Sequence, residues 1–305
     1  MKAPPETMTL VPPTRAPADA AASASLAPAL PLWQGVLHTV LVGLATWALS
    51  WQAGALTRTH VLVWLMALCA AALAVVAARR GRIASLELWM LEASALAAAS
   101  GATGLWAWHL AFKPAAMAIA IIFVASNAYQ SSARGQFSYK SWGFLLAALL
   151  ASLAGDVFLM LQDLFIPGLV SFLLAHLAYI ALFGRRVRWL AHGGALLVTV
   201  GIGAAMYAWL WQGGLPAELR APVAVYVLVI ALMAAQALGR AAQLQTEASR
   251  TVALGACIFM LSDSVLAVDR FVQPVPLALF WVLATYYAAQ FCIVHGMVRH
   301  LRGQP

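Results

Sequence analysis

The chain of 305 residues is 64% hydrophobic and only 9% charged, with a formal net charge of +8. Soluble proteins average about 45 to 50% apolar and about 25% charged residues, so this composition excludes a soluble globular protein. The basic residues form no run or stripe on a polar scaffold, which argues against a nucleic-acid partner. The composition therefore indicates an integral membrane protein.

Residues 1–31 contain seven prolines among many Ala and Ser residues. Such a segment can neither fill a core nor sustain a helix, so we expect a disordered amino-terminal tail. The first apolar stretch begins only at Leu32 and is long enough to cross a bilayer. We therefore expect an uncleaved first helix rather than a cleaved signal peptide.

Ten apolar segments of spanning length follow, because a helix of about 20 residues crosses a bilayer. Glu87 and Glu92 interrupt the third segment, and the fourth is the shortest. We predict an all-α, polytopic membrane helix bundle with about ten transmembrane helices. The segments lie at residues 32–52, 60–78, 86–108, 113–128, 141–161, 164–183, 189–211, 221–239, 251–269 and 276–298.

The distribution of Lys and Arg tests this count, because cytoplasmic loops are enriched in both residues. With ten spans, 14 basic residues fall on one side and 4 on the other. We therefore expect both termini in the cytoplasm and, in a bacterium, an inner-membrane protein. The larger group is Lys2, Arg15, Arg79, Arg80, Arg82, Arg134, Lys140, Arg185, Arg186, Arg188, Arg240, Arg250, Arg299 and Arg302, and the smaller is Arg58, Lys113, Arg220 and Arg270.

An aspartate, a proline eleven residues later and a tyrosine twenty-three residues later recur in two predicted helical hairpins. If the hairpins are equivalent, each proline marks an outer turn and the two aspartates lie at similar depth. A chance similarity between two apolar hairpins is the alternative. The two sets are Asp156, Pro167 and Tyr179, and Asp263, Pro274 and Tyr286.

Asp156 and Asp263 are the candidate catalytic residues. An ionisable side chain in a span costs about 2.5 to 3.5 kcal/mol, so it persists where it faces a protein interior and usually has a function. The alternative is a structural role, in which each aspartate ties helices together by a hydrogen bond of about 1 kcal/mol. Asp163 and Asp269 are expected at helix ends near water, without a function. Polar or small residues expected around the pair are Ser152, Gly155, His176, Tyr179, Ser262, Tyr286, Tyr287 and Gln290.

The sequence holds no pattern typical of a metal or cofactor site. A zinc site usually needs three or four His, Cys, Asp or Glu ligands at recognisable spacing, and no such spacing occurs. Cys69, Cys257 and Cys292 are isolated in apolar segments, as packing residues are. Nucleotide-binding loops and a Gly-x-Ser-x-Gly elbow are absent too. We expect neither a metal nor a cofactor.

Five stretches of the chain carry specific polar motifs within apolar segments. They are Ser152-Leu-Ala-Gly-Asp156-Val-Phe-Leu-Met-Leu, Ala175-His176-Leu-Ala-Tyr179, Phe259-Met-Leu-Ser262-Asp263, Thr285-Tyr286-Tyr287-Ala-Ala-Gln290 and Lys113-Pro114. These stretches resemble the lysoplasmalogenase (YhhN-like) family of membrane proteins. The resemblance covers about residues 86–300, a length that accommodates the eight helices usual for the family. Either residues 32–80 form two additional amino-terminal helices or the third span is misassigned, and the charge alternation favours the additional helices.

The resemblance implies hydrolysis of the vinyl ether bond of a lysoplasmalogen, which yields a fatty aldehyde and glycerophosphoethanolamine or glycerophosphocholine. It also implies that Asp156 and Asp263 are catalytic, with a lysophospholipid substrate and membrane lipids as partners. Lys113 either holds the substrate phosphate or extends to lipid phosphates. We expect further substrate contacts from His176, Tyr179, Ser262, Tyr286, Tyr287 and Gln290.

Two carboxyl groups suit this chemistry, because an enol ether is cleaved by protonation of carbon and capture of the resulting cation by water. One carboxyl group must be protonated, a form that removal from water favours. The other, ionised, can stabilise the cation and accept a proton from water. The sequence leaves open which aspartate is the acid. It also leaves open a proton-coupled transporter or receptor-like bundle, and an enzyme or binder for another lysolipid.

Overall fold

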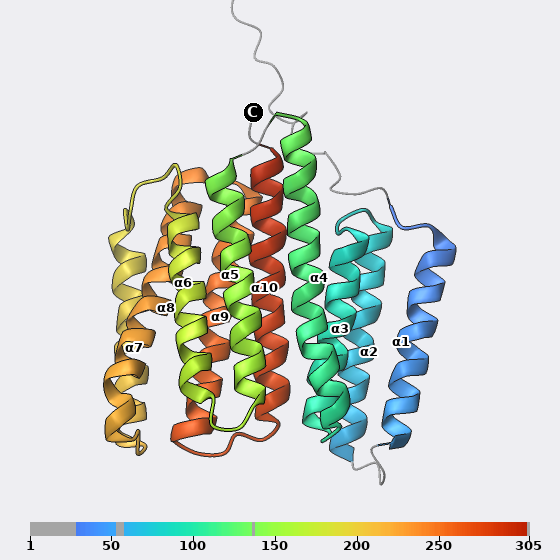
Figure 1. Ribbon diagram of the computed structural model, residues 1–305, viewed down its shortest axis with the longest axis horizontal. Coiled ribbons are helices and arrows are strands. Elements are labelled where there is room, and N and C mark those ends of the chain that lie inside the picture. The colour runs from blue at the N-terminus through green and yellow to red at the C-terminus, as the bar shows by residue number, and fades with distance from the viewer. Residues whose placement is uncertain (1–28, 53–57, 136–137, 304–305) are drawn as a thin grey trace, which may run out of the picture.

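The computed structural model describes residues 29–52, 58–135 and 138–303. Its described residues form ten α-helices joined by short connections, as Figure 1 shows, and this confirms the predicted all-α bundle. The helices are α1 (Leu32–Gln52), α2 (Arg58–Arg79), α3 (Ser85–Ala102), α4 (Trp106–Ala133), α5 (Tyr139–Met160), α6 (Phe165–Phe183), α7 (Gly193–Gln212), α8 (Ala217–Leu244), α9 (Glu247–Phe271) and α10 (Ala278–Arg302).

Successive helices run in opposite directions, so α1 begins and α10 ends at the same end of the bundle (Figure 1). The connections after α2, α4, α6 and α8 also lie at this end, and they carry Arg80, Arg134, Arg185 and their neighbours. We call it the basic end and the other the opposite end. The helix alternation therefore matches the predicted charge distribution, of which Lys2 and Arg15 lie outside the described residues.

Within the described residues, nine of the helices are long and apolar enough to cross a membrane, and α3 is the exception. The boundaries predicted for the third and fourth spans were wrong. Helix α3 ends at Ala102 rather than 108, because Gly104 adopts a φ of +76°, which favours glycine and turns the chain. Helix α4 then begins at Trp106 instead of 113 and continues through Pro114.

Helix α3 carries two buried carboxylates, and each has a histidine partner on a neighbouring helix. Glu92 lies 2.8 Å from His38 of α1, and Glu87 lies 2.7 Å from His295 of α10. A buried carboxylate is tolerated where it is paired and hydrogen-bonded. These pairs explain how α3 keeps two glutamates inside the bundle, and they join it to helices on both sides.

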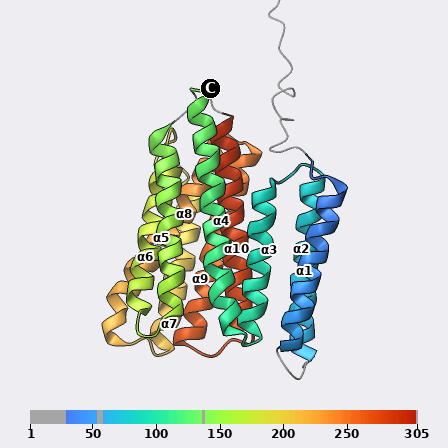
Figure 2. The same ribbon diagram turned by 45° about the vertical axis from the view of Figure 1, so that its right-hand side comes forward.

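Helices α1 and α2 lie at the edge of the bundle beside α3, as Figure 2 shows. Just before α1, Leu30 is buried and its backbone N–H donates to the carbonyl of Ala78 at 3.2 Å. The end of the segment predicted as a disordered tail therefore packs on α2. Residues 1–28 of that segment lie outside the described residues.

Helices α9 and α10 pack closely because each places a glycine at the contact. A Cβ atom at Gly296 would lie 2.6 Å from the carbonyl oxygen of Ala248, and one at Gly255 would lie 2.8 Å from that of Ala289. Both distances are shorter than real contacts, so only glycine fits at either position. This contact fixes the position of α9, which carries Asp263, relative to α10, which carries Tyr286.

Candidate active site

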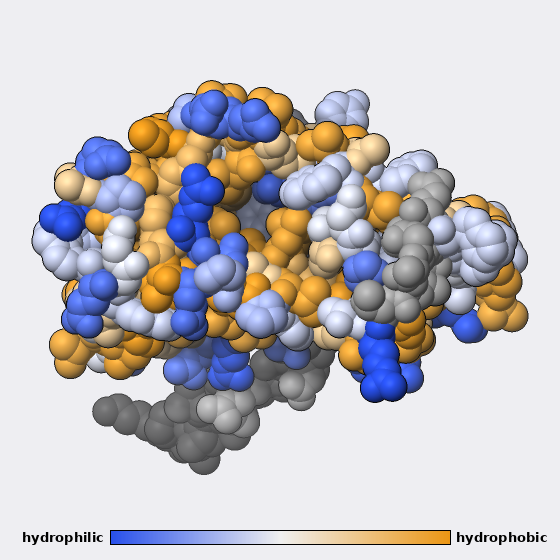
Figure 3. Space-filling model, turned by 90° about the horizontal axis from the view of Figure 1, so that it is seen from below, coloured by the Kyte–Doolittle hydropathy of each residue, from blue (hydrophilic) through white to orange (hydrophobic). Residues whose placement is uncertain are grey.

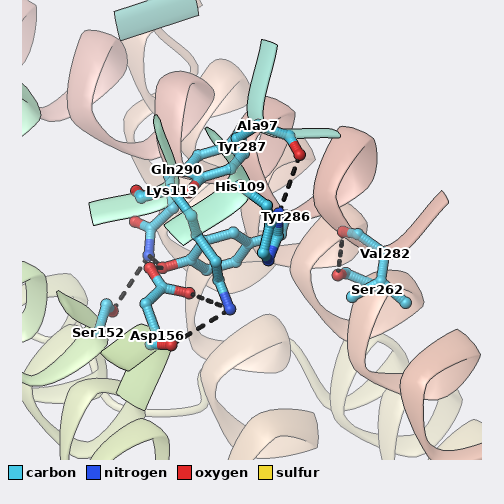
Figure 4. A network of polar contacts seen from close by, with 10 residues as sticks. All are labelled: Ala97, His109, Lys113, Ser152, Asp156, Ser262, Val282, Tyr286, Tyr287 and Gln290. Carbon is cyan, nitrogen blue, oxygen red and sulfur yellow. Dashed lines mark hydrogen bonds and ion pairs between the residues drawn. The ribbon is translucent and has the colours of Figure 1, made fainter. Parts of the chain in front are cut away.

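Asp156 lies in the last turns of α5, where it is 1% exposed and surrounded by charge-stabilising partners. Its Oδ1 lies 3.3 Å from Nζ of Lys113 on α4, and the Tyr286 hydroxyl of α10 donates to Oδ2 at 2.8 Å (Figure 4). The Lys113 ammonium also donates to the backbone carbonyl of Asp156 at 3.3 Å. The ion pair and the phenol together compensate a negative charge on Asp156.

Four more of the predicted residues hold this network in place. Gln290 accepts from the Tyr179 hydroxyl at 2.6 Å and donates to Oγ of Ser152 at 3.1 Å. The Tyr287 hydroxyl donates to the backbone carbonyl of Lys113 at 2.8 Å. Helices α4, α5, α6 and α10 are thus linked around Asp156 by buried hydrogen bonds, which favours one fixed arrangement of the side chains.

Asp263 has different surroundings, because it lines an apolar cavity between α6, α7, α8 and α9. Most of the cavity wall is aliphatic or aromatic. The Tyr226 hydroxyl of α8 donates to Oδ2 of Asp263. The described residues offer Asp263 no ion pair comparable with the one between Lys113 and Asp156.

Tyr226 was not predicted as a site residue, because it lies alone in an apolar span without a motif around it. The only available signal was its residue type, because a tyrosine buried within a span needs a partner for its hydroxyl. That partner is Asp263, on the next helix in the chain.

His176 of α6 is 0% exposed and packs beside Tyr226, the hydrogen-bond donor of Asp263. Its ring packs edge-on against Phe259 and Tyr226, with centroids 4.8 Å and 5.2 Å away. Within the part of the chain that the structure describes, neither ring nitrogen has a hydrogen-bond partner. A buried polar group without a partner is costly, so a bound water molecule is the partner expected for His176.

Phe172 of α6 separates the cavity from Asp156. Its ring lines the cavity and packs so closely on Gly155 that a Cβ atom there would lie 2.6 Å from it. Asp156 itself does not line the cavity. Contacting rings link the two acids. Tyr286, which bonds Asp156, packs on Phe259, and His176 packs on both Phe259 and Tyr226, which bonds Asp263.

None of the residues predicted to contact substrate lines the apolar cavity, and two of them have contacts that differ from those expected. Lys113 is 6% exposed and bound to Asp156, so in this structure it neither lies free for a substrate phosphate nor extends to lipid phosphates. The Ser262 hydroxyl donates to the carbonyl of Val282 at 2.9 Å and lies apart from the Asp156 network, as Figure 4 shows. Ser262 ties α9 to α10.

The internal repeat is only partly reflected in the structure. Pro274 lies in the connection between α9 and α10, as expected, but Pro167 lies within the first turn of α6 rather than in the preceding turn. A proline is tolerated there because the first backbone N–H groups of a helix have no partner within it. The two tyrosines also differ, since Tyr286 bonds Asp156 of the other hairpin whereas Tyr179 bonds Gln290.

The opposite end of the molecule is hollowed near its centre, as the view from below in Figure 3 shows. Hydrophobic residues surround much of the hollow, with hydrophilic residues among them.

No three His, Cys, Asp or Glu side chains of the described ranges are grouped as metal ligands would be.

Comparison with known proteins places this arrangement in a family. Residues 108–297, which run from the first turn of α4 into α10, match the YhhN family. The match covers more than half of the chain. The chain belongs to the YhhN family. Helices α1 to α3 lie outside the matched residues, so the predicted eight-helix domain over residues 86–300 stays a prediction.

Several curated relatives of this YhhN-family chain are named lysoplasmalogenases. Lysoplasmalogenase TMEM86B of Homo sapiens is 36% identical over 155 residues, which are 51% of this chain and 63% of the relative. TMEM86A of Bos taurus is 34% identical over 160 residues, 50% and 65% of the two chains. The lysoplasmalogenase of Mycobacterium bovis is 29% identical over 198 residues, 62% and 71%. The match thus spans under two thirds of both mammalian relatives, and no solved structure matches.

Proposed function

We propose that this protein hydrolyses the vinyl ether bond of lysoplasmalogens, releasing a fatty aldehyde and glycerophosphoethanolamine or glycerophosphocholine. The observation that carries the proposal is the carboxyl group of Asp263 at the wall of an apolar cavity, connected through packed aromatic rings to a second carboxylate, which is paired with Lys113. An apolar cavity suits a single long hydrocarbon chain. The names of the YhhN-family relatives support the same reaction.

The surroundings of the two aspartates suggest their roles. Asp263 would be the acid, because it opens onto the cavity and Tyr226 occupies Oδ2, which leaves Oδ1 to carry a proton. Asp156 would be the carboxylate, because the Lys113 ammonium compensates its charge. Two carboxyl groups with such different partners can divide the work of acid and base.

In the proposed reaction, Asp263 gives its proton to the vinyl carbon remote from oxygen, and the adjacent carbon becomes an oxocarbenium ion. Water held by His176 adds to this carbon and loses a proton to Asp156. Neither residue lines the cavity, so this step requires the Phe172 ring to turn aside. The hemiacetal then returns its hydroxyl proton to Asp263, and Asp156 protonates the leaving glycerol oxygen. Both acids are restored, and one water molecule is consumed.

We further propose that the basic end faces the cytoplasm, because Lys and Arg accumulate in cytoplasmic loops. In a bacterium the protein would then lie in the inner membrane, with its described termini inside the cell. The opposite end, toward which α5 and α9 carry the two aspartates, would face outward.

The proposal is tested by incubating the purified protein with lysoplasmenylethanolamine in D₂O and trapping the aldehyde at once. Protonation at carbon predicts an aldehyde with one deuterium on the carbon next to the carbonyl group. The acyl analogue, lysophosphatidylethanolamine, should yield no aldehyde. Binding of lysoplasmenylethanolamine without aldehyde release, or an aldehyde without deuterium, would contradict the proposed hydrolysis.

A further inference from the structure

The opposite end of the bundle carries a second hollow lined by charges of both signs. Arg270 at the end of α9, Asp163 in the turn between α5 and α6, and Glu218 in the first turn of α8 line this hollow. Arg270 and Phe165 also line the apolar cavity that contains Asp263. The charged hollow is therefore adjacent to the cavity in which the proposed reaction takes place.

These charges are not paired with one another. None of the ion pairs or hydrogen bonds of the described residues involves the side chain of Arg270, Asp163 or Glu218. The guanidinium of Arg270 lies over the ring of Phe165, 5.1 Å from its centroid. Stacking on an aromatic ring leaves the N–H groups at the edge of a guanidinium available for an oxyanion. The hollow thus offers a cation and two carboxylates to one ligand.

The spacing along α9 fits the substrate of the proposed reaction. Asp263 and Arg270 are seven residues apart, so they lie on the same face of the helix, about 10 Å apart along its axis. In a lysoplasmalogen, six bonds separate the vinyl ether carbon from phosphorus, which is about 7 Å when extended. The lengths of the Asp263 and Arg270 side chains cover the difference between these two distances. A vinyl ether beside Asp263 therefore places the phosphate near Arg270.

We propose that Arg270, Asp163 and Glu218 form a subsite for a zwitterionic phospholipid headgroup. The Arg270 guanidinium binds the phosphate, and the two carboxylates attract the ammonium of ethanolamine or choline, while the hydrocarbon chain lies in the apolar cavity. This inference rests on the proposed function and specifies its substrate class. It assigns a role to Asp163, which the sequence alone placed at a solvated helix end.

The kinetic test compares Arg270→Gln with the matched control Arg220→Gln. Arg220 lies near the start of α8, stacks on Trp211 at 4.0 Å and bonds the carbonyl of Leu215, and it lines neither space. Arg270→Gln should raise the KM for lysoplasmenylethanolamine about tenfold or more, as expected for loss of a charge-assisted hydrogen bond. The kcat, and the KM for a 1-alkenylglycerol without phosphate, should stay unchanged, and Arg220→Gln should behave as wild type. An unchanged KM for the phospholipid, or an equal rise for both substrates, overturns the subsite.

A binding measurement separates this inference from the proposed hydrolysis. The probe is a non-cleavable alkyl-ether lysophosphocholine, titrated calorimetrically into the full chain in detergent. Arg270→Gln should weaken its binding, and the double variant Asp163→Asn/Glu218→Gln should weaken it while sparing an alkyl-ether lysophosphatidic acid, which has no ammonium. If the wild type releases no aldehyde but these losses occur, the hydrolysis fails and the subsite stands. If binding is unchanged in both variants, the subsite is overturned whether or not aldehyde is released.

Discussion

At the scale of single residues, the two aspartates differ more than their matching motifs suggest. Asp156 is enclosed by Lys113 and Tyr286, whereas Asp263 faces an apolar cavity with Tyr226 as its hydrogen-bond donor. The residue types, taken with the family resemblance, pointed to most of the polar network around Asp156. They did not indicate Tyr226, because hydropathy gives the depth of a side chain along its helix but not the neighbouring helix it faces.

The bond between Tyr226 and Asp263 gives a prediction at this scale. Removing the hydroxyl in Tyr226→Phe frees Oδ2 of Asp263 and so loosens the orientation of the proposed acid. We expect kcat for aldehyde release to fall about tenfold to a hundredfold, since a misplaced general acid loses part of its contribution. The KM should change little, because the aromatic ring still lines the cavity.

Tyr207→Phe is the matched control for this experiment. The Tyr207 hydroxyl donates to the carbonyl of Arg220 at 3.2 Å, so removal of this hydroxyl also costs one hydrogen bond that a tyrosine donates. Steady-state kinetics of both variants measure whether kcat falls in Tyr226→Phe alone. A kcat that is the same in Tyr226→Phe and Tyr207→Phe would argue against an orienting role for Tyr226.

At the scale of helices, hydropathy located the spans but did not locate every helix end. The third and fourth spans were misplaced because the turn at Gly104 interrupts an apolar stretch, and because α4 continues through Pro114. The pairing of Glu87 and Glu92 with histidines on distant helices was not predictable either. Such pairs depend on which helices pack against each other, and the sequence of one helix does not show its neighbours.

The close contact of α9 and α10 gives a prediction at the scale of helices. In Gly296→Ala the added methyl group meets the backbone of α9, so the two helices must separate. Overpacking of this kind costs about 1 to 3 kcal/mol, and we expect a lower Tm in detergent together with slower aldehyde release. Gly201→Ala on α7 is the control, because nothing lies within 4 Å of its added Cβ. Equal Tm values for the two variants would contradict the close contact.

At the scale of the whole molecule, the site depends on two hairpins that are far apart in the sequence. Helices α5 and α6 supply Asp156 and His176, and helices α9 and α10 supply Asp263 and Tyr286. Helix number and alternation could be predicted, because hydropathy and basic residues record them. The cavity could not be predicted, because it arises where α6, α7, α8 and α9 meet. The charged hollow could not be predicted either, because its charges come from α8, α9 and the turn between α5 and α6.

The role of the two acids is tested by aldehyde release from Asp156→Asn and Asp263→Asn, with Asp269→Asn as the control. Asp269 lies on α9 but accepts a bond from the Val275 backbone at 2.9 Å, outside the proposed machinery. If the two acids carry the reaction, each of their variants loses at least about a hundredfold in rate while still purifying as a folded protein, and Asp269→Asn remains active. Asp156→Asn should also lower the Tm, because it leaves the buried Lys113 ammonium without its ion pair. Aldehyde release at the native rate by a folded Asp156→Asn or Asp263→Asn protein would show that the two acids do not carry the reaction.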